Sequence, residues 1–312
     1  MAIAFTFPGQ GSQAVGMGKD LAEAFPEARA IFDEVDEALG QKLSQIIWEG
    51  PEETLTLTSN AQPALMAVSM AALRALEARG FSLKDKVSFV AGHSLGEYSA
   101  LCAAGVFSLA DTARLLRIRG DAMQRAVPVG AGAMAAIIGL EQDAVEAACA
   151  EGAQGEVCQI ANDNGGGQLV ISGAKAAVER AAGGCTARGA KRALMLQVSA
   201  PFHSALMQPA ADAMAEAWRR SKKAPAVPVV ANVTVTPVTD PDEIARRLVE
   251  QVTGRVRWRE TVEWFAANGV TGLCEIGSGK VLSGLARRIA RDVATTNVGT
   301  AADVESALAA LA

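Results

Sequence analysis

The fold of this sequence is decided by the stretch Gly92-His93-Ser94-Leu95-Gly96. It follows an apolar run at 87–91 and precedes a helical pattern that begins at Glu97. A Gly-x-Ser-x-Gly motif between a strand and a helix is typical of a nucleophile elbow, a tight turn that exposes the serine hydroxyl. The flanking glycines suit such a turn because the backbone leaves no room for side chains. This context favours the elbow over a purely structural glycine turn, so Ser94 is the predicted nucleophile.

The chain contains two histidines, His93 and His203. A serine nucleophile needs a base that works near neutral pH, and histidine is the usual one. His93 lies inside the elbow, where its side chain is expected to point away from Ser94. His203 is therefore the predicted base, and its alternative is a hydrogen-bonded histidine of the core.

Composition excludes several classes of protein. The 312 residues are 50% hydrophobic, which allows one large α/β domain or two smaller ones. A net charge of −5 without a long basic run argues against nucleic acid as a partner. The five cysteines form no C-x-x-C pair, which favours a reducing compartment and no thiolate metal site. The N-terminus lacks a basic signal sequence, and no apolar stretch approaches the ~20 residues of a membrane span. We expect a soluble, cytoplasmic protein.

The order of predicted elements indicates an α/β-hydrolase-like core with a parallel sheet, formed by residues 1–126 and 199–312. Residues 127–198 read β-α-β-β-α-β, the order of a ferredoxin-like subdomain inserted between Ser94 and His203. The active site is then expected in the cleft between the two parts. Within the insert, strands are expected at 133–140, 156–161, 168–172 and 193–198, with helices at 141–150 and 174–187.

Two further helices carry polar residues of interest. Ala61-Gln62-Pro63 is expected to open a helix, with Pro63 near its first position. Ser108 begins a second helix that runs to about Ala126. Arg119 is the only arginine of that helix near its apolar face. A cation there calls for a partner, and a substrate carboxylate would suit the two parallel hydrogen bonds of a guanidinium.

Two other patterns are weaker. Gly9-Gln10-Gly11-Ser12-Gln13-Ala14 matches the loose dinucleotide form G-x-G-x-x-A, but Asp33 and Glu34 lie in a helical pattern where a strand end is required. The alternative use of this loop is to donate backbone amides to an oxyanion. Gly277-Ser278-Gly279-Lys280 departs from the phosphate-binding pattern and is predicted to be a loop before a helix. No group of His, Cys and carboxylates has the spacing of metal ligands.

Taken together, the motifs resemble one family over nearly the whole chain. They occur in the order 7–13 (Phe-Pro-Gly-Gln-Gly-Ser-Gln), 61–64 (Ala-Gln-Pro-Ala), 92–97 (Gly-His-Ser-Leu-Gly-Glu), Arg119-Gly120, Ala161-Asn162, 202–204 (Phe-His-Ser) and 279–282 (Gly-Lys-Val-Leu). The sequence is similar to the malonyl-CoA:acyl carrier protein transacylases of type II fatty acid synthesis. Their joint occurrence is far more specific than any single motif.

The resemblance implies a role for each matching residue. Ser94 is the acylated nucleophile and His203 its general base. The backbone amides of Gln10 and Leu95 form the oxyanion hole, and Arg119 binds the malonyl carboxylate. Gln62 and Asn162 line the site, and Phe202 limits the size of the acyl group. The main-chain carbonyl of Gln251 orients the histidine. Basic residues of the family flank the cleft and dock the acidic carrier, and here these are Lys191, Arg192, Arg287 and Arg288.

The activity so implied is ping-pong transfer of a malonyl group from malonyl-CoA, through Ser94, to the phosphopantetheine thiol of an acyl carrier protein. It needs no metal or cofactor, and a monomer is expected. A serine esterase or thioesterase is one alternative, and a binding protein without turnover is another. Two loop positions depart from the family, because Gly166 and Ser278 stand where proline is frequent, which puts the rigidity of those loops in question.

Overall fold

The structure is a computed structural model that describes residues 2–218 and 222–311. Its larger part is built on a sheet with the strand order β11-β10-β1-β2-β7-β8. Neighbouring strands are parallel from β11 to β7, and β8 is antiparallel to β7. The strands are β1 (Ala2–Phe7), β2 (Phe89–Gly92), β7 (Val229–Val230), β8 (Pro237–Val238), β10 (Val270–Ile276) and β11 (Ala294–Val298).

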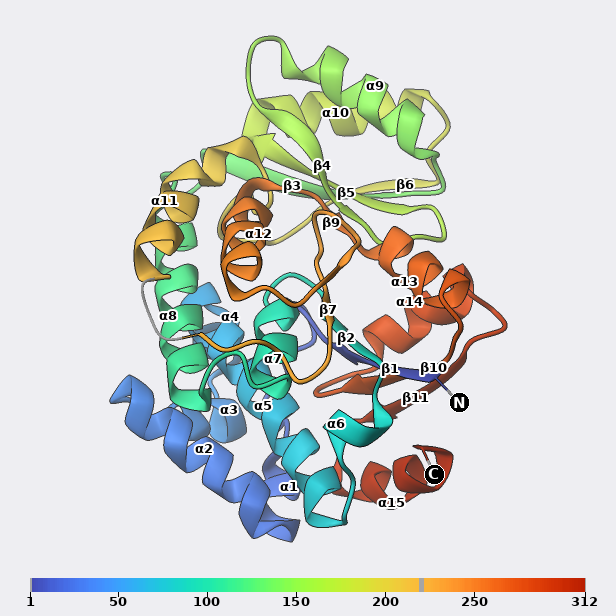
Figure 1. The fold of residues 1–312 in the computed structure, drawn as a ribbon. Coiled ribbons are helices and arrows are strands. Elements are labelled where there is room, and N and C mark those ends of the chain that lie inside the picture. Colours follow the sequence, from blue (N-terminus) through green and yellow to red (C-terminus); the bar gives the residue numbers. More distant parts are fainter. Residues whose placement is uncertain (1, 219–221, 312) are drawn as a thin grey trace.

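Helices surround this sheet (Figure 1). β1, β2 and β10 are buried along nearly their whole length, as expected for parallel strands that are covered on both faces. The helices of the large part are α1 (Lys19–Ala24), α2 (Pro26–Leu39), α3 (Leu43–Glu49), α4 (Glu52–Thr56), α5 (Thr58–Ala78), α6 (Leu83–Lys86), α7 (Gly96–Ala103), α8 (Leu109–Arg125), the 3₁₀ turn η1 (Ala205–Met207), α11 (Gln208–Ala217), α12 (Pro241–Thr253), α13 (Trp258–Ala267), α14 (Val281–Ile289) and α15 (Ala301–Leu311).

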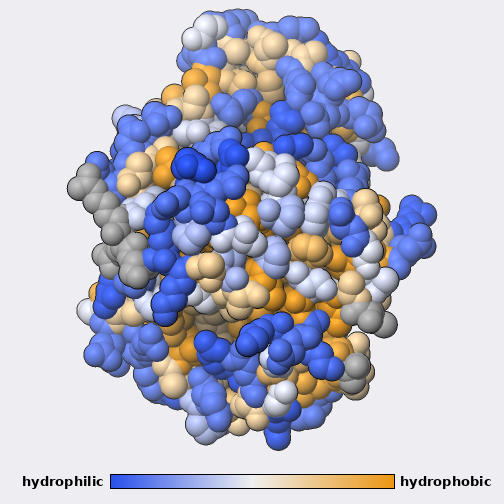
Figure 2. Space-filling view, viewed as in Figure 1, coloured by the Kyte–Doolittle hydropathy of each residue, from blue (hydrophilic) through white to orange (hydrophobic). Residues whose placement is uncertain are grey.

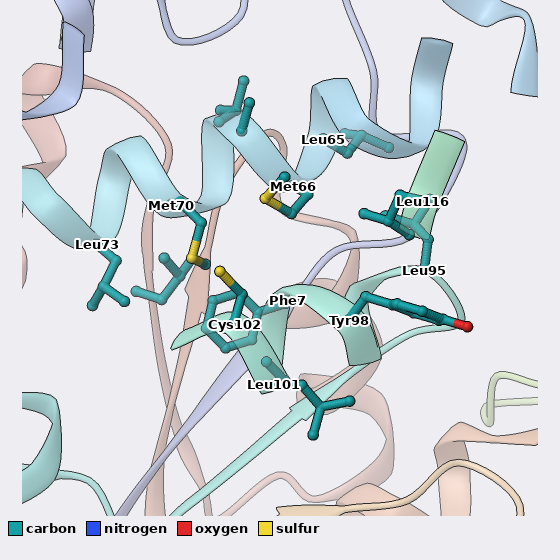
Figure 3. Packing of buried hydrophobic residues seen from close by; sticks show 14 of the residues in the cluster. Phe7, Leu65, Met66, Met70, Leu73, Leu95, Tyr98, Leu101, Cys102 and Leu116 are labelled. Carbon is teal, nitrogen blue, oxygen red and sulfur yellow. The ribbon is translucent and has the colours of Figure 1, made fainter. Parts of the chain in front are cut away.

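The main hydrophobic core lies where α5 crosses the helix of the elbow. α5 is apolar on nearly all sides, which is typical of a helix inside a core. Figure 3 shows Met66 and Met70 of α5 facing the elbow helix α7, from which Tyr98 and Cys102 project. The turn that presents Ser94 is therefore supported by a packed apolar layer.

The prediction that Pro63 lies near the start of a helix is wrong. α5 begins at Thr58, because the carbonyl of Leu57 accepts the N–H groups of Asn60 and Ala61 and closes a turn ahead of the proline. A proline inside a helix leaves the carbonyl four residues earlier without its usual donor. Here that residue is Ser59, where α8 crosses so closely that a Cβ on Gly120 would lie 2.7 Å from the Ser59 Cα.

A second, smaller sheet has the strand order β6-β3-β5-β4-β9. β3, β5, β4 and β6 come from one stretch of chain and pair antiparallel, and α9 packs against α10 in Figure 1. This arrangement agrees with the β-α-β-β-α-β order expected from the sequence. Its elements are β3 (Gly132–Ile138), α9 (Gln142–Ala153), β4 (Cys158–Asp163), β5 (Gln168–Ala174), α10 (Lys175–Ala187) and β6 (Arg192–Met195).

The strand β9 (Val256–Arg257) was not foreseen. It comes from the C-terminal part of the chain and pairs in parallel with Asn162 and Asp163 of β4. Two residues carry too little periodicity to be recognised as a strand. The small sheet is therefore completed by the large part of the molecule. The division at residues 126/127 and 198/199 stays a prediction.

The four strands of the insert all end two or three residues away from the expected positions. β4 runs on to Asp163, so Asn162 lies in a strand next to an irregular step in the ladder, and β6 ends at Met195. On the face shown in Figure 2, hydrophilic residues cover much of both parts, and most of the exposed hydrophobic residues lie in the lower half of the view, within the large part. None of the helices in the described ranges is long and apolar enough to cross a membrane.

Candidate active site

The elbow has the strained geometry that an exposed serine requires. Ser94 has φ 54°, a left-handed conformation that is uncommon for a residue with a side chain. A Cβ on Gly92 would lie 1.9 Å from the carbonyl carbon of Gly96, and a Cβ on Gly96 would lie 2.2 Å from the carbonyl oxygen of Phe7. Both positions therefore require glycine, because any side chain would force the turn apart and displace Ser94.

His203 lies opposite this serine. Its Nε2 is 2.7 Å from the Ser94 Oγ, and its Nδ1 is 2.9 Å from the carbonyl oxygen of Gln251 and 3.1 Å from that of Gly254. Since both carbonyls can only accept, Nδ1 carries the proton and Nε2 is free to accept the serine proton. Burial, followed by the charge of Arg119, lowers the His203 pKa to about 3. The imidazole is neutral at pH 7, as a base must be.

Arg119 of α8 reaches the same oxygen. Its Nη2 donates to the Ser94 Oγ at 3.1 Å and to the Gln251 Oε1 at 2.8 Å, while Nη1 donates to the Gln62 Oε1 at 2.8 Å. The residue is 1% exposed and forms no ion pair within the described residues. The Ser94 oxygen thus accepts from Arg119 and directs its own proton toward His203.

Asn232, which follows β7, braces the turn, and sequence reasoning missed it. Its Oδ1 accepts from the backbone N–H of Ser94 at 2.9 Å, and its Nδ2 donates to the Gly92 carbonyl at 2.8 Å. The side chain is fully buried. Asn232 therefore supplies hydrogen bonds that the strained turn cannot form with itself.

Glu97 and the side chain of Gln251 complete the network below the turn. The Gln251 Nε2 donates to the Ser94 carbonyl at 2.9 Å and to the Glu97 Oε2 at 2.8 Å, and the Asn232 N–H donates to the same Glu97 oxygen at 3.2 Å. Burial raises the pKa of the Glu97 carboxyl to about 7, against the hydrogen bonds from Gln251 and Asn232 and the charge of Arg119. Gln251 was expected to act through its carbonyl alone, whereas its side chain also joins Arg119 to Glu97.

Two backbone amides near Ser94 have no partner in the described part of the chain, one in the loop that lines the cavity and one directly after the serine. Within the described residues, the N–H groups of Gln10 and Leu95 donate to no other atom of the chain. The loop carrying Gln10 approaches the elbow closely, since a Cβ on Gly9 would lie 2.7 Å from the His93 carbonyl oxygen. Ser278 holds this loop by donating from its hydroxyl to the Ser12 carbonyl at 2.8 Å. That bond restrains the position where the family often has proline.

His93 occupies a different place from His203. Its Nε2 is 2.9 Å from the Asn164 Oδ1, and its ring packs against Trp258. Burial lowers its pKa below the usual value, partly offset by the hydrogen bond to Asn164. The structure therefore points its side chain away from the Ser94 oxygen, toward the loop that contains Gly166.

A cavity of about 380 Å³ opens over these groups, between the two sheets. The large part contributes Ser94, His203, Arg119 and Gln62 to its lining. The small subdomain and the segment that follows it contribute Met134, Asn162, Val170, Leu196, Gln197, Val198 and Phe202. The Asn162 Oδ1 is buried without a hydrogen-bond partner. A bound ligand with a donor would satisfy it.

The four basic residues proposed for docking divide between two neighbourhoods. The stem of Lys191 packs on Gly139, whose N–H bonds to the Gly167 carbonyl, and the Arg288 side chain lies against Gly166 in the same glycine loop. Lys191 and Arg288 thus flank one loop, and Arg192 is exposed beside Lys191. Arg287 instead donates from Nε to the Thr295 Oγ1 in β11 at 2.8 Å.

No group of three or more His, Cys, Asp or Glu side chains in residues 2–218 and 222–311 could hold a metal ion. The arrangement is instead a serine hydroxyl bonded to a neutral histidine, with two free amides and a buried cation beside it. Such a site can form and resolve an acyl-serine ester.

Comparison with known proteins places this site in a family. Residues 4–302 match the model of the acyl transferase domain, and the chain belongs to that family. The malonyl CoA-acyl carrier protein transacylase of Escherichia coli K12 is 50% identical over 92% of both chains. The crystal structure of an acyl-carrier-protein S-malonyltransferase from Bartonella henselae is 64% identical, with a TM-score of 0.98, and covers 100% of this chain and 99% of its own.

One related structure was solved with a partner. It shows a type II PKS acyl-carrier protein in complex with its malonyl-transacylase. The matched chain is 46% identical to this protein, with a TM-score of 0.96, and the match covers 99% of this protein and 100% of the matched chain. These likenesses confirm the mixed α/β fold with its parallel sheet and the family expected from the motifs.

Proposed function

We propose that this protein is an acyltransferase that moves the malonyl group of malonyl-CoA to an acyl carrier protein. The observation that carries the proposal is the buried Arg119, whose Nη2 lies 3.1 Å from the nucleophile oxygen of Ser94. A guanidinium in this position suits an acyl group that ends in a carboxylate, because it donates two parallel hydrogen bonds. The names of the relatives at 50% and 64% identity support the same assignment.

The first half-reaction follows from the geometry. His203 takes the Ser94 proton while the oxygen attacks the thioester carbonyl. The N–H groups of Gln10 and Leu95 stabilise the tetrahedral oxyanion, because they are preorganised and otherwise unpaired. The C–S bond then breaks, CoA leaves as the thiol with the proton returned by His203, and malonyl remains on Ser94 as an ester.

The second half-reaction reverses these steps. The phosphopantetheine thiol of a carrier protein gives its proton to His203 and attacks the malonyl ester, and Ser94 is regenerated. Neither half requires a metal or a cofactor, because the serine, the histidine and the amides supply all the chemistry. Scattered free cysteines and the family assignment support a cytoplasmic enzyme, which we expect to act as a monomer.

The carrier protein is expected to dock beside the glycine loop. Lys191, Arg192 and Arg288 have no ion-pair partner within the described residues. Three exposed apolar residues follow Lys191 and Arg192 along the chain, namely Leu194 and Met195 of β6 and Leu196 just after it. Carrier proteins of the family are acidic, and local positive potential can attract such a partner although the enzyme's net charge is −5. Arg287 contributes less, since its guanidinium is engaged with Thr295.

Mass spectrometry of the intact protein after incubation with malonyl-CoA tests the assignment. One malonyl adduct is expected on the peptide that contains Ser94, and holo acyl carrier protein should remove it. Ser94→Ala should abolish the adduct, while Ser99→Ala, which changes a buried serine of the helix α7 that follows the elbow, should retain it. An adduct that persists in Ser94→Ala, or one on Cys102, would contradict the proposal. Loss of malonyl to water faster than to carrier protein would identify a thioesterase.

A further inference from the structure

The charge of Arg119 is balanced indirectly. Its guanidinium is buried, and its hydrogen bonds go to the Ser94 hydroxyl and the carboxamide oxygens of Gln62 and Gln251. A buried cation with only neutral partners is costly. A carboxylate does lie one amide away, because the Gln251 carboxamide accepts from Arg119 at 2.8 Å and donates to Glu97 at 2.8 Å. Guanidinium, amide and carboxylate therefore form a continuous polar chain.

We propose that Glu97 is a positioning residue that acts through Gln251 on Arg119 and makes the preference for an anionic acyl group depend on pH. In the empty site it balances the charge of Arg119 through Gln251, and the carboxylate of the acyl group replaces it in that role. This inference rests on the function proposed above. Glu97 does not touch the acyl group in this scheme, since it lies on the far side of Gln251 from Arg119.

The replacement has a consequence for protons. One buried cation and one anion are balanced, whereas one cation with two anions leaves excess negative charge in a poorly solvated region. Binding of a malonyl carboxylate should therefore draw a proton onto Glu97. The carboxyl is suited to this because its pKa in the empty site is about 7. Below that pH it is already protonated and malonyl binds well, and above it the ionised Glu97 opposes the substrate anion.

The surroundings leave few competing groups. Arg119 of α8 and the buried Tyr98 of α7 are the titratable side chains that interact electrostatically with Glu97, and burial keeps the Tyr98 hydroxyl neutral by raising its pKa. The strands packed against α7, namely β1, β2 and β7, carry no titratable residue. On α5, Arg74 and Glu77 pair with each other near its exposed end. Gln251 and Asn232 do not titrate.

Acylation by a malonyl thioester of N-acetylcysteamine tests the inference, because this probe lacks the phosphates of CoA and their own titration. Intact-protein mass spectrometry at rising probe concentrations gives an apparent affinity between pH 6 and 8.5. In the unaltered enzyme the affinity should fall by about thirtyfold over this range, as expected for one competing ionisation with a pKa of about 7. In Glu97→Gln it should stay level and exceed that of the unaltered enzyme at pH 8.5. The acetyl thioester should show no such change.

Two controls separate this role from a structural one. Asp36→Asn removes a buried carboxylate of α2 that accepts from the backbone N–H and the hydroxyl of Ser44, outside the network of Glu97, and should leave the pH dependence intact. In an Arg119→Ala background, adding Glu97→Gln should no longer alter the malonyl-to-acetyl ratio, because coupled residues are not additive. Proton uptake during acylation of the unaltered enzyme at pH 7.5 should also be measurable in weak buffer.

The same pH dependence in Glu97→Gln as in the unaltered enzyme would overturn the inference. So would an equal loss of malonyl and acetyl transfer with an unchanged ratio, which is what a merely structural role predicts. Absence of proton uptake in the unaltered enzyme would overturn it as well, even if the variant does not fold. Failure of the unaltered enzyme to form any malonyl adduct would overturn the proposed function, and this inference with it.

Discussion

The two walls of the cavity differ in how firmly their side chains are held. On the large part, Ser94, His203 and Arg119 are bound to one another and to a buried network of Gln251, Asn232 and Glu97. On the small subdomain, the lining is mostly apolar, and the Asn162 oxygen has no partner. We therefore expect the first wall to govern reaction rate and recognition of the acyl carboxylate, and the second wall to govern the size of the acyl group and contact with the carrier protein. Substitutions on the first wall should lower activity most.

The largest effect in this comparison should come from His203→Ala. Loss of the general base is expected to lower the rate of Ser94 acylation by ~10²–10⁴-fold. His93→Ala should cost far less, because its ring bonds to Asn164 and not to Ser94. Single-turnover acylation by malonyl-CoA, with circular dichroism to check folding, measures both. If the acylation rate fell more in a folded His93→Ala variant than in His203→Ala, His93 would be the base and the assignment of the two histidines would be wrong.

Arg119→Ala should lower malonyl acylation by roughly tenfold to a hundredfold, the range expected for a lost charge-assisted hydrogen bond. Transfer of uncharged acetyl should fall less or improve, since the buried cation no longer disfavours a neutral chain. Competition between malonyl and acetyl thioesters gives the ratio directly. An unchanged ratio would show that Arg119 does not hold the carboxylate.

Phe202 lies where the two walls meet and lines the cavity at 9% exposure. Phe202→Ser should raise methylmalonyl transfer relative to malonyl by several-fold, because one extra methyl group is worth about 1–3 kcal/mol in a tight pocket. The ratio of kcat/KM for the two CoA esters is the measurement. If Phe202 serves packing alone, thermal stability will fall while this ratio stays constant.

The smallest effect should come from the exposed edge of the small subdomain. Reversing Lys191 and Arg192 to Glu is expected to slow transfer to carrier protein by several-fold while acylation by malonyl-CoA is unchanged. Added salt should weaken the difference, because exposed charges are screened within ~10 Å at 0.1 M. Arg288→Glu should behave similarly and Arg287→Glu less so. Equal loss in both half-reactions would place these residues at the CoA site.

The pH dependence offers a further check on the first wall. Because the His203 pKa lies well below 6.5, the base remains neutral in mildly acidic solution, and acylation should lose activity only well below pH 6. Between pH 6.5 and 3, His203 is protonated in the unfolded chain but neutral in the folded protein. The contribution of His203 to the free energy of unfolding is therefore fully present above pH 6.5 and is lost as the pH falls toward 3. Rates with the acetyl thioester, which are free of the malonyl carboxylate, measure the first effect. An acid limb near pH 6.5 would contradict this environment for His203.

Residues that carry a local motif were predictable from the sequence. The glycines on either side of Ser94 indicate its role, and the position of Arg119 near an apolar helix face indicates that of Arg119. Both signals lie within a few neighbouring residues. Asn232 and the side-chain role of Gln251 gave no such signal. They act across 138 and 157 residues of chain, and Asn232 follows a strand of two residues. The wrong start assigned to the helix at Pro63 has the same origin, since packing of α8 on that turn overrides the local preference for proline.

The short strand β9 has a consequence for how the molecule can move. The carbonyls of Gln251 and Gly254, which hold His203, lie just before this strand, and the strand joins the edge of the small sheet. The opposite edge is β6, next to Lys191 and Arg192. The small subdomain is therefore attached to the large part at the edge where β9 pairs with β4, close to the carbonyls that hold His203. Its other edge, β6, pairs with no described strand of the large part. We expect that a carrier protein docking at the unpaired edge can shift β6 while His203 keeps its alignment.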